Sequence, residues 1–298
     1  FGTTEFHIAG SGNQSITFPS AAATSYYFAL RIVIASTGGT VTWTGNNSIR
    51  ELFYTSGTVA FGTSAVYFLD ETLGSNTFDT GGSACSFYDV YFCNHNITTT
   101  LNSNLVVTHL LSSGNVGRHY FNGSNILCGG DFTHLNTFVW DVGTSILIFQ
   151  GSANQIWTGS NDTDYFFGMN VTINKSGGTL TLASVITYKT GTFTYTAGTV
   201  DPGTSTLQIL AAATLNTSTL DWNNITFTAG VYTVTLSSGL KLSGNWTNNA
   251  TLTLAGNQTV TFDGTSIIAG ATTFYNFTIN AGKTVSLTST QTFTISNI

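Results

Sequence analysis

Charged residues are scarce in this sequence, and their scarcity argues against whole classes of function. Asp, Glu, Lys and Arg make up 7% of the 298 residues, against roughly 25% in an ordinary soluble domain. The seven Lys and Arg residues are scattered singly. Because no basic stripe is present to neutralise phosphates, we expect no nucleic-acid partner.

Residues typical of helices and of membrane spans are also rare. Methionine occurs once, and strong helix formers such as Glu, Lys and Arg are few. No run of about 18 apolar residues occurs, so we expect no membrane span in this chain. The 2 prolines and 32 glycines suit many short strands joined by tight turns. Since the sequence begins at Phe1 without a methionine and stops inside a repeat at Ile298, we expect a piece of a longer protein.

Cysteine is limited to an odd set of three, Cys85, Cys93 and Cys128, whose spacing matches no zinc site. Two interpretations stay open: three buried small side chains, or a disulfide between Cys85 and Cys93 in an oxidising compartment. The five histidines show no metal-ligand spacing either. We therefore expect no metal and no cofactor.

What the sequence does contain is a repeat of short alternating strands. The phrase NNITF at 223–227 returns as YNFTIN at 275–280 and is preceded by MNVTIN at 169–174, so that Asn170, Asn224 and Asn276 lie 54 and then 52 residues apart. Apolar residues alternate with Thr or Ser between these landmarks, as in a sheet with one buried face. A period of this length built of strands indicates a solenoid or an array.

We therefore predict an all-β fold, a parallel β-helix or β-solenoid with repeats of 52–54 residues. Each repeat would form two three-stranded coils of roughly 27 residues, stacked as neighbouring strands of a sheet are. Residues 1–137 would form an irregular N-terminal solenoid or cap region with loops, and residues 138–298 the regular solenoid, within one continuous body. The alternative is a string of tandem β-sandwich domains, although an immunoglobulin-like sandwich needs about 100 residues.

The phrases TFYNFTINAGKTVSLTS, DPGTSTLQI and GNWTNNATLTLAGNQTVTFDG carry a resemblance. With them the chain resembles the β-strand-repeat extracellular proteins of microbial surfaces, and it is similar in style to β-helical adhesins and phage tail fibres. The resemblance is good over about residues 138–298 and loose before them. It implies a structural or adhesive role at a cell or virion surface, and it carries over no catalytic residue.

Catalytic groups do not form a recognisable constellation. Asp141, Asp201, Asp221 and Asp263 all lie beside turns, where aspartates usually bond their own backbone. No Ser occupies a nucleophile elbow, and no His has Glu-assisted spacing. We therefore expect that the protein is not an enzyme.

Two groups of residues are candidates for ligand binding. Trp43, Trp157 and Trp246 lie near turns, where exposed rings would serve as platforms for a surface glycan, and Arg118, His119 and Tyr120 form the densest polar cluster of the irregular half. Trp222, Phe274 and Tyr275 are instead expected to stack inside the coil. We expect any specific recognition surface to lie between Ala35 and Gly130.

Asn-x-Ser/Thr sequons recur beside strands at Asn170, Asn224 and Asn276, where each is either an N-glycosylation acceptor or a turn or ladder residue. Thirteen sequons occur in all, as candidate N-glycosylation acceptors. They begin at Asn13, Asn46, Asn96, Asn122, Asn161, Asn170, Asn174, Asn216, Asn224, Asn245, Asn249, Asn257 and Asn276.

The function that these features favour is the nonenzymatic shaft of a surface fibre, filament or adhesin. Exposed coil ends are unpaired edges, so we expect self-association into a filament or homo-oligomer. The alternatives are a viral receptor-binding tail fibre or tailspike module that recognises glycan, a polysaccharide lyase or hydrolase, and an ice-binding protein that uses rows of Thr.

Overall fold

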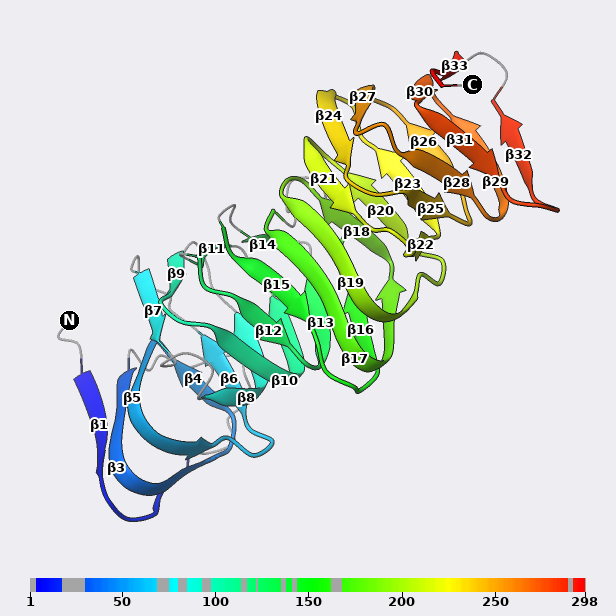
Figure 1. Ribbon diagram of the computed structural model, residues 1–298. Helices are drawn as coiled ribbons and strands as arrows, with labels where there is room; N and C mark the ends of the chain where they lie inside the picture. Colours follow the sequence, from blue (N-terminus) through cyan, green and yellow to red (C-terminus); the bar gives the residue numbers. More distant parts are fainter. Residues whose placement is uncertain are drawn as a thin grey trace. The chain divides into compact units, whose positions relative to one another are not determined.

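The computed structural model describes residues 4–17, 30–68, 75–79, 85–92, 98–113, 117–121, 123–134, 138–140, 144–161, 168–288 and 292–297. These residues form strands that pair in parallel, and no helix occurs among them. The fold is an all-β parallel β-solenoid of about 10 turns of stacked coils (Figure 1). This confirms the predicted fold class. By compactness the chain divides into two units, Phe1–Gly151 and Ser152–Ile298.

The first unit is built from two parallel sheets between which the chain alternates. Strand β3 joins one sheet, β4 the other, β5 the first again, and this alternation continues to β12. The orders are β1-β3-β5-β7-β9-β11-β14, with β2 beside β3, and β15-β12-β10-β8-β6-β4, with β13 beside β10. The strands are β1 (Thr4–Gly10), β2 (Gln14–Thr17), β3 (Leu30–Thr44), β4 (Asn47–Ile49), β5 (Glu51–Ala60), β6 (Ala65–Phe68), β7 (Ser75–Asp79), β8 (Ser86–Phe92), β9 (Thr98–Leu101), β10 (Leu105–Ser113), β11 (Gly117–Tyr120), β12 (Ile126–Cys128), β13 (Asp131–His134), β14 (Phe138–Trp140) and β15 (Ile146–Phe149).

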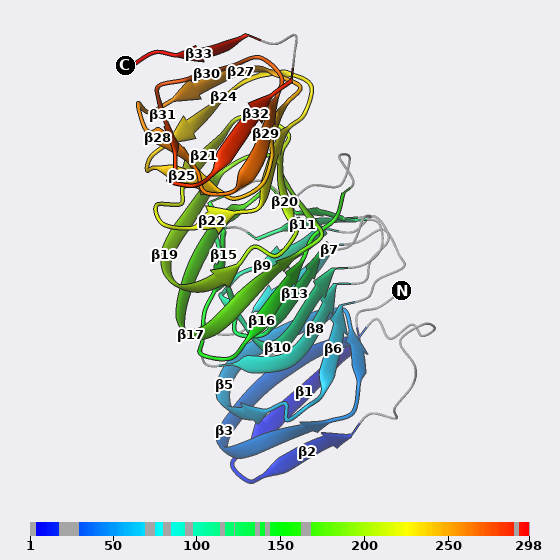
Figure 2. The same ribbon diagram turned by 90° about the vertical axis from the view of Figure 1, so that its right-hand side faces the viewer.

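The second unit becomes three-sided from β21 onward. The coils from β21 to β29 each give one strand to each of three sheets, ordered β17-β19-β21-β24-β27, β22-β25-β28-β31 and β18-β20-β23-β26-β29-β32 (Figure 2). Strands β30 and β33 pair in a separate two-stranded sheet. The strands are β16 (Gln155–Thr158), β17 (Asn170–Ala183), β18 (Val185–Tyr188), β19 (Thr192–Asp201), β20 (Thr206–Ile209), β21 (Ala213–Asn216), β22 (Asp221–Trp222), β23 (Asn224–Phe227), β24 (Val231–Leu236), β25 (Leu240–Leu242), β26 (Trp246–Asn248), β27 (Thr251–Ala255), β28 (Thr259–Phe262), β29 (Thr265–Ala269), β30 (Thr272–Phe274), β31 (Asn276–Ile279), β32 (Thr284–Leu287) and β33 (Phe293–Ile295).

The coil is shorter than the roughly 27 residues expected from half of the sequence repeat. In the regular part, Asn224 bonds Asn245 in the next coil across 21 residues, and Thr288 bonds Ile268 across 20 residues. Three short strands with tight corners fit in about 20 residues, because a strand rises about 3.3 Å per residue. From β21 onward the coils are three-stranded as predicted, but a repeat of 52–54 residues spans more than two of them.

The sequence repeat therefore rotates around the solenoid instead of matching its coil. Asn170 lies in β17, Asn224 in β23 and Asn276 in β31, and these strands belong to three different sheets. Each face needs the same alternation of inward apolar and outward polar residues. One phrase can therefore serve on any of the three faces, and its recurrence does not measure the coil.

The core of each coil is lined by the inward residues of its strands, many of them aromatic. The ring of Trp246 packs between Phe227 and Phe274, with centroid distances of 4.7 and 5.0 Å. All three side chains are fully buried. Such offset and tilted ring pairs stabilise a core beyond their burial alone, and here they connect one coil to the next.

Candidate functional site

The three tryptophans proposed as glycan platforms are buried. Trp43, Trp157 and Trp246 are 2%, 1% and 0% exposed. Trp43 packs on Phe61 at 5.2 Å, and Trp157 stacks on Phe193 at 6.1 Å. Their expected exposure is wrong, because each ring takes an inward position of a strand although a turn lies close by in sequence.

The expectation for the internal aromatic ladder is correct in two of three cases. Trp222 and Phe274 are fully buried, whereas Tyr275 is 37% exposed. Strand alternation explains the difference, because neighbouring residues point to opposite faces. With Phe274 directed inward, Tyr275 faces outward.

The cluster Arg118, His119 and Tyr120 lies in strand β11 and not in a turn. The backbone of Arg118 pairs with Thr98 in β9 and with Val139 in β14. The side chains of the cluster lie outside the described part of the structure, so their role in binding stays a prediction.

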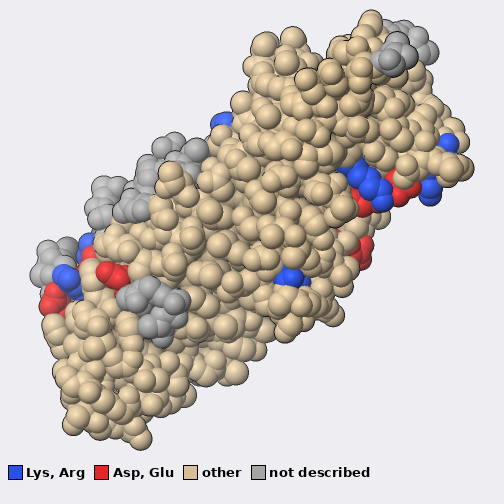
Figure 3. All heavy atoms as spheres, in the orientation of Figure 1, with Lys and Arg blue, Asp and Glu red and all other residues tan. Residues whose placement is uncertain are grey.

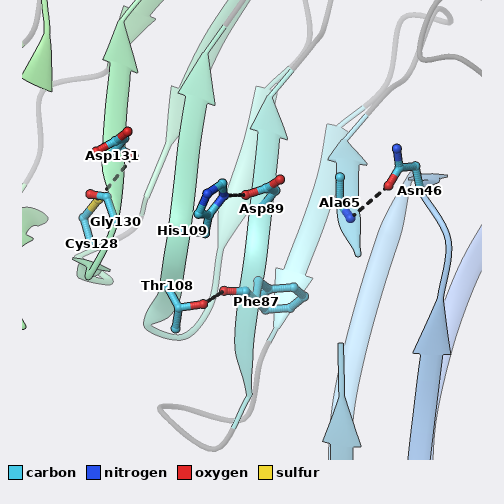
Figure 4. Close-up of polar contacts among 9 residues, drawn as sticks. All are labelled: Asn46, Ala65, Phe87, Asp89, Thr108, His109, Cys128, Gly130 and Asp131. Carbon is cyan, nitrogen blue, oxygen red and sulfur yellow. Dashed lines mark hydrogen bonds and ion pairs between the residues drawn. The ribbon is translucent and has the colours of Figure 1, made fainter. Parts of the chain in front are cut away.

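Five sequon asparagines act as rungs between coils. In each, the side-chain Oδ1 accepts a hydrogen bond from a backbone N–H about one coil further along the chain. The pairs are Asn13 with Thr40 (2.9 Å), Asn46 with Ala65 (3.3 Å; Figure 4), Asn170 with Thr192 (2.8 Å), Asn224 with Asn245 (2.9 Å) and Asn245 with Ile267 (2.9 Å). The ladder interpretation therefore holds for Asn170 and Asn224, and Asn13, Asn46 and Asn245 make the same contact.

The remaining sequons differ in exposure. Asn161, Asn174, Asn249 and Asn257 are exposed, and Asn216 and Asn276 are half-buried. Asn96 and Asn122 lie outside the described residues. Glycan occupancy stays a prediction for all thirteen.

The cysteines are described in part. Cys85 and Cys128 are fully buried, and burial raises the pKa of Cys85 to about 12. The Cys128 Sγ lies 3.2 Å from the carbonyl oxygen of Gly130 and donates to it (Figure 4). Cys93 lies outside the described residues, so its pairing with Cys85 stays a prediction.

One lysine bridges two carboxylates on the outer face of β22, β25 and β28. Lys241 Nζ lies 2.6 Å from an oxygen of Asp263 and 3.2 Å from one of Asp221. A hollow of about 300 Å³ lies beside it, lined among others by Ser218, Lys241 and Thr261. Two carboxylates thus converge near a surface depression, which is the arrangement that a polysaccharide-cleaving enzyme would need.

The pKa shifts of Lys241 and Asp263 both favour the charged forms of the two groups. The hydrogen bond to Asp263 raises the pKa of Lys241, against a smaller effect of desolvation. The hydrogen bonds from Lys241 and then Asn280 lower the pKa of Asp263. A general acid or base needs a pKa shifted toward neutrality, and both of these shifts go the other way. The group therefore has the character of a charge ladder between coils.

The predicted turn aspartates separate into two kinds. Asp201 accepts a hydrogen bond from the backbone N–H of Gly203 in its own turn, as expected. Asp221 and Asp263 instead pair with Lys241. Asp141 lies outside the described residues.

Threonines form in-register rows on the outer face of the second unit. Thr192, Thr214 and Thr235 are successive partners in β19, β21 and β24. Most of the face visible in Figure 3 likewise carries neither acidic nor basic side chains. The face seen in Figure 3 is therefore largely uncharged.

The most distinctive polar and aromatic group lies on β6, β8 and β10 of the first unit. We call it the tyrosine face, and it consists of Tyr67, Tyr88, Asp89, Tyr91 and His109. The rings of Tyr67 and Tyr91 stack at 4.5 Å with an interplanar angle of 8°, and those of Tyr88 and His109 stack at 4.2 Å, also at 8°. His109 Nδ1 lies 2.6 Å from Asp89 Oδ1 (Figure 4).

The tyrosine face lies within the predicted recognition region, but sequence reasoning missed its members. Tyr67 and Tyr91 are distant in sequence and become neighbours only through the pairing of β6 with β8. Their separation along the chain is longer than one coil of the regular part, so no fixed period marks the pair. The sequence indicates only that Tyr91 faces outward, because its neighbours Val90 and Phe92 are apolar. Both neighbours are buried in the structure.

Within the described ranges, no three His, Cys, Asp or Glu side chains come together as a metal site requires. No helix that could cross a membrane is found in the part of the chain that the structure describes. No family model, curated protein or solved structure matches this chain.

Proposed function

We propose that this chain is an extracellular, nonenzymatic structural solenoid that forms the shaft of a surface fibre, filament or adhesin. The β-solenoid fold is compatible with a structural or adhesive role. The observation that carries the proposal is that backbone ladders, side-chain hydrogen bonds and ring stacks all connect successive coils.

Side-chain hydrogen bonds show these connections between successive coils most clearly. Thr108 Oγ1 donates to the carbonyl oxygen of Phe87 at 2.9 Å (Figure 4), and Ser56 Oγ donates to that of Ser36 at 2.9 Å. The two partners are 21 and 20 residues apart, which is about one coil. Since each coil contacts mainly its neighbours, stability accumulates along the stack. Such a body is suited to hold its length under load.

Self-association is the second part of the proposal. In β31 and β32, Ile279 is 43% and Leu287 is 53% exposed, whereas their register partners Phe262 and Ile268 are buried. The same inward positions are thus covered in one coil and open in the next. Strands β31 and β32 are also the last members of their sheets, and such edges template pairing with another chain. We propose that a second copy stacks here wherever no further coil of the same chain covers these positions.

Sedimentation velocity over a range of concentrations tests this association. Wild-type protein should form larger species as its concentration rises, and Leu287→Glu should shift that transition to higher concentration. Ser286→Glu is the matched control, since Ser286 is the outward neighbour of Leu287 in β32. Wild-type protein that stays monomeric throughout, or two variants with equal behaviour, would contradict the stacking.

The nonenzymatic part is tested by incubating the protein with neutral and uronic-acid polysaccharides. We expect no new reducing ends and no unsaturated products. Turnover that disappears in Asp263→Asn would show instead that the Lys241 group is catalytic.

A further inference from the structure

We propose that the tyrosine face is a carbohydrate-binding site for neutral hexopyranose units. This inference rests on the proposed adhesive role and names the ligand class for it. The face presents stacked aromatic rings next to a paired carboxylate and imidazole, which is a combination of apolar and hydrogen-bonding groups that a sugar ring requires. Its two halves are the Tyr67–Tyr91 stack and the His109–Asp89 pair.

The ring stack supplies the apolar half of the site. Tyr67 is held outward between the buried Val66 and Phe68, because adjacent residues of a strand point to opposite faces. Tyr67 in β6 is the register partner of Tyr91 in β8, so the two rings lie side by side on the sheet. Tyrosine rings offer an amphipathic body and tip, and the C–H groups on one side of a pyranose pack against such surfaces.

Small residues border this stack on both sides. Ser48 is the register partner of Tyr67 in β4, and Ser112 is that of Tyr91 in β10. A serine side chain does not extend as far from the sheet as a tyrosine ring. Tyr67 and Tyr91 are half-buried, so part of each ring surface is open to a ligand.

The pair of His109 and Asp89 supplies the hydrogen-bonding half. A carboxylate only accepts hydrogen bonds, so the 2.6 Å contact places a proton on Nδ1 of His109. In the neutral ring, Nε2 is then an acceptor, and the carboxylate keeps further acceptor positions. The His109 side chain is 55% exposed. Sugar hydroxyls, which both donate and accept, match this set.

The position of Asp89 joins the two halves. Asp89 and Tyr91 are two residues apart in β8, so both side chains are presented within about 7 Å of each other along the strand. Stacking on Tyr88 fixes the ring of His109 before any ligand arrives. A site whose side chains are already ordered loses less conformational entropy on binding.

The charge of the site selects the ligand class. Strands β6, β8 and β10 contain Asp89 but no Lys or Arg. An anionic sugar would meet a carboxylate without a compensating cation from these strands. Neutral sugars avoid this repulsion, so they are the class that the face fits.

The test is binding of the full chain to an array of neutral, sialylated and uronic-acid oligosaccharides, followed by titration with the strongest neutral binder. We expect binding to neutral members. Tyr91→Ala should weaken it about tenfold or more, which corresponds to about 1.4 kcal/mol, whereas Tyr91→Phe should retain it. Asp89→Asn should weaken binding as well. Tyr275→Ala, which removes an exposed tyrosine of the second unit, should leave the affinity unchanged.

Three results would overturn the site: no neutral sugar bound by the wild-type chain, binding unchanged in both Tyr91→Ala and Asp89→Asn, or binding confined to acidic sugars. Circular dichroism melts show whether each variant is folded, and Tyr67→Ala replaces Tyr91→Ala if the latter is not. Sedimentation of the same samples separates the two proposals. Failure of glycan binding with intact self-association removes the site and leaves the structural role in place.

Discussion

Asn224 Oδ1 accepts a hydrogen bond from the backbone N–H of Asn245 at 2.9 Å. One coil later Asn245 repeats the contact with the backbone N–H of Ile267, also at 2.9 Å. Two successive rungs thus fix three neighbouring strands, β23, β26 and β29, by side chains as well as by their ladders. The rungs satisfy the backbone donors of Asn245, just before β26, and of Ile267, within β29.

Replacing a rung should destabilise the stack measurably. We expect Asn224→Ala to lower the free energy of unfolding by about 0.5–1.5 kcal/mol, the usual net contribution of one hydrogen bond. Urea unfolding followed by circular dichroism measures the change. Asn174→Ala is the control, because Asn174 is an exposed sequon residue of β17. An equal loss of unfolding free energy in both variants would show that the hydrogen bond from Asn245 to Asn224 does not stabilise the stack.

Glycan occupancy should follow the same distinction. The Nδ2 of Asn224 donates to the side-chain oxygen of Asn223 at 2.5 Å and to the carbonyl oxygen of Ser205 at 3.3 Å. A glycan is attached at this nitrogen and would disrupt those bonds. After expression in a host that glycosylates asparagine, peptide mapping should find glycan on the exposed Asn174 or Asn249 in preference to Asn224. Full occupancy at Asn224 would contradict the ladder assignment there.

Removing a central ring should cost much more than removing a surface ring. Trp246 is fully buried between two aromatic side chains. Trp246→Ala should therefore lower the free energy of unfolding by about 3–5 kcal/mol. Tyr275→Ala, at an exposed position, should change it by about 0.5 kcal/mol or less. Thermal and urea unfolding of both variants gives the comparison, and similar losses would contradict the inward assignment of Trp246.

The Lys241 bridge should make stability depend on pH in acid. Lys241 lowers the pKa of Asp263, so the stabilisation is present above the ordinary carboxyl pKa and is lost as pH falls through the lowered value. In Lys241→Met the stability difference from wild type should be largest near neutral pH and shrink on acidification. Urea unfolding between neutral pH and acid measures this. Lys283→Met is the control, since Lys283 acts on Asp263 only as a more distant charge, and an equal pH profile in both variants would contradict the bridge.

The same Lys241 has a raised pKa, chiefly through its hydrogen bond to Asp263. Its contribution is therefore present below the ordinary lysine value and is lost as pH rises through the raised one. The wild-type advantage over Lys241→Met should accordingly decline again in strong alkali. Urea unfolding of the same two proteins at alkaline pH measures this decline.

The fold class was predictable because alternation is a local property. In strands such as Thr259–Phe262, apolar and hydroxyl residues alternate without interruption, and this pattern alone indicates a half-buried strand. The coil length was not predictable from the repeat. Asn170, Asn224 and Asn276 mark equivalent phrases on three different sheets, and nothing in the sequence distinguishes one face from another.

The site residues were less predictable than the fold. Closeness to a turn was a poor guide to exposure, because Trp43 and Trp157 take inward positions beside their turns. The tyrosine face required the pairing of β6 with β8 and of β8 with β10. The β8–β10 pairing contains a register shift between Val107 and Leu110, which brings His109 against Tyr88 and which no simple period predicts.

The central claim, that this chain serves as a stack of coils holding one another under load, is tested most directly by pulling single molecules from both ends. Coils of about 20 residues that detach one after another should lengthen the chain in steps of roughly 70 Å, since an extended residue spans about 3.5 Å. A regular series of such steps is the predicted result. Extension of the whole chain in a single step at negligible force would contradict a mechanical role.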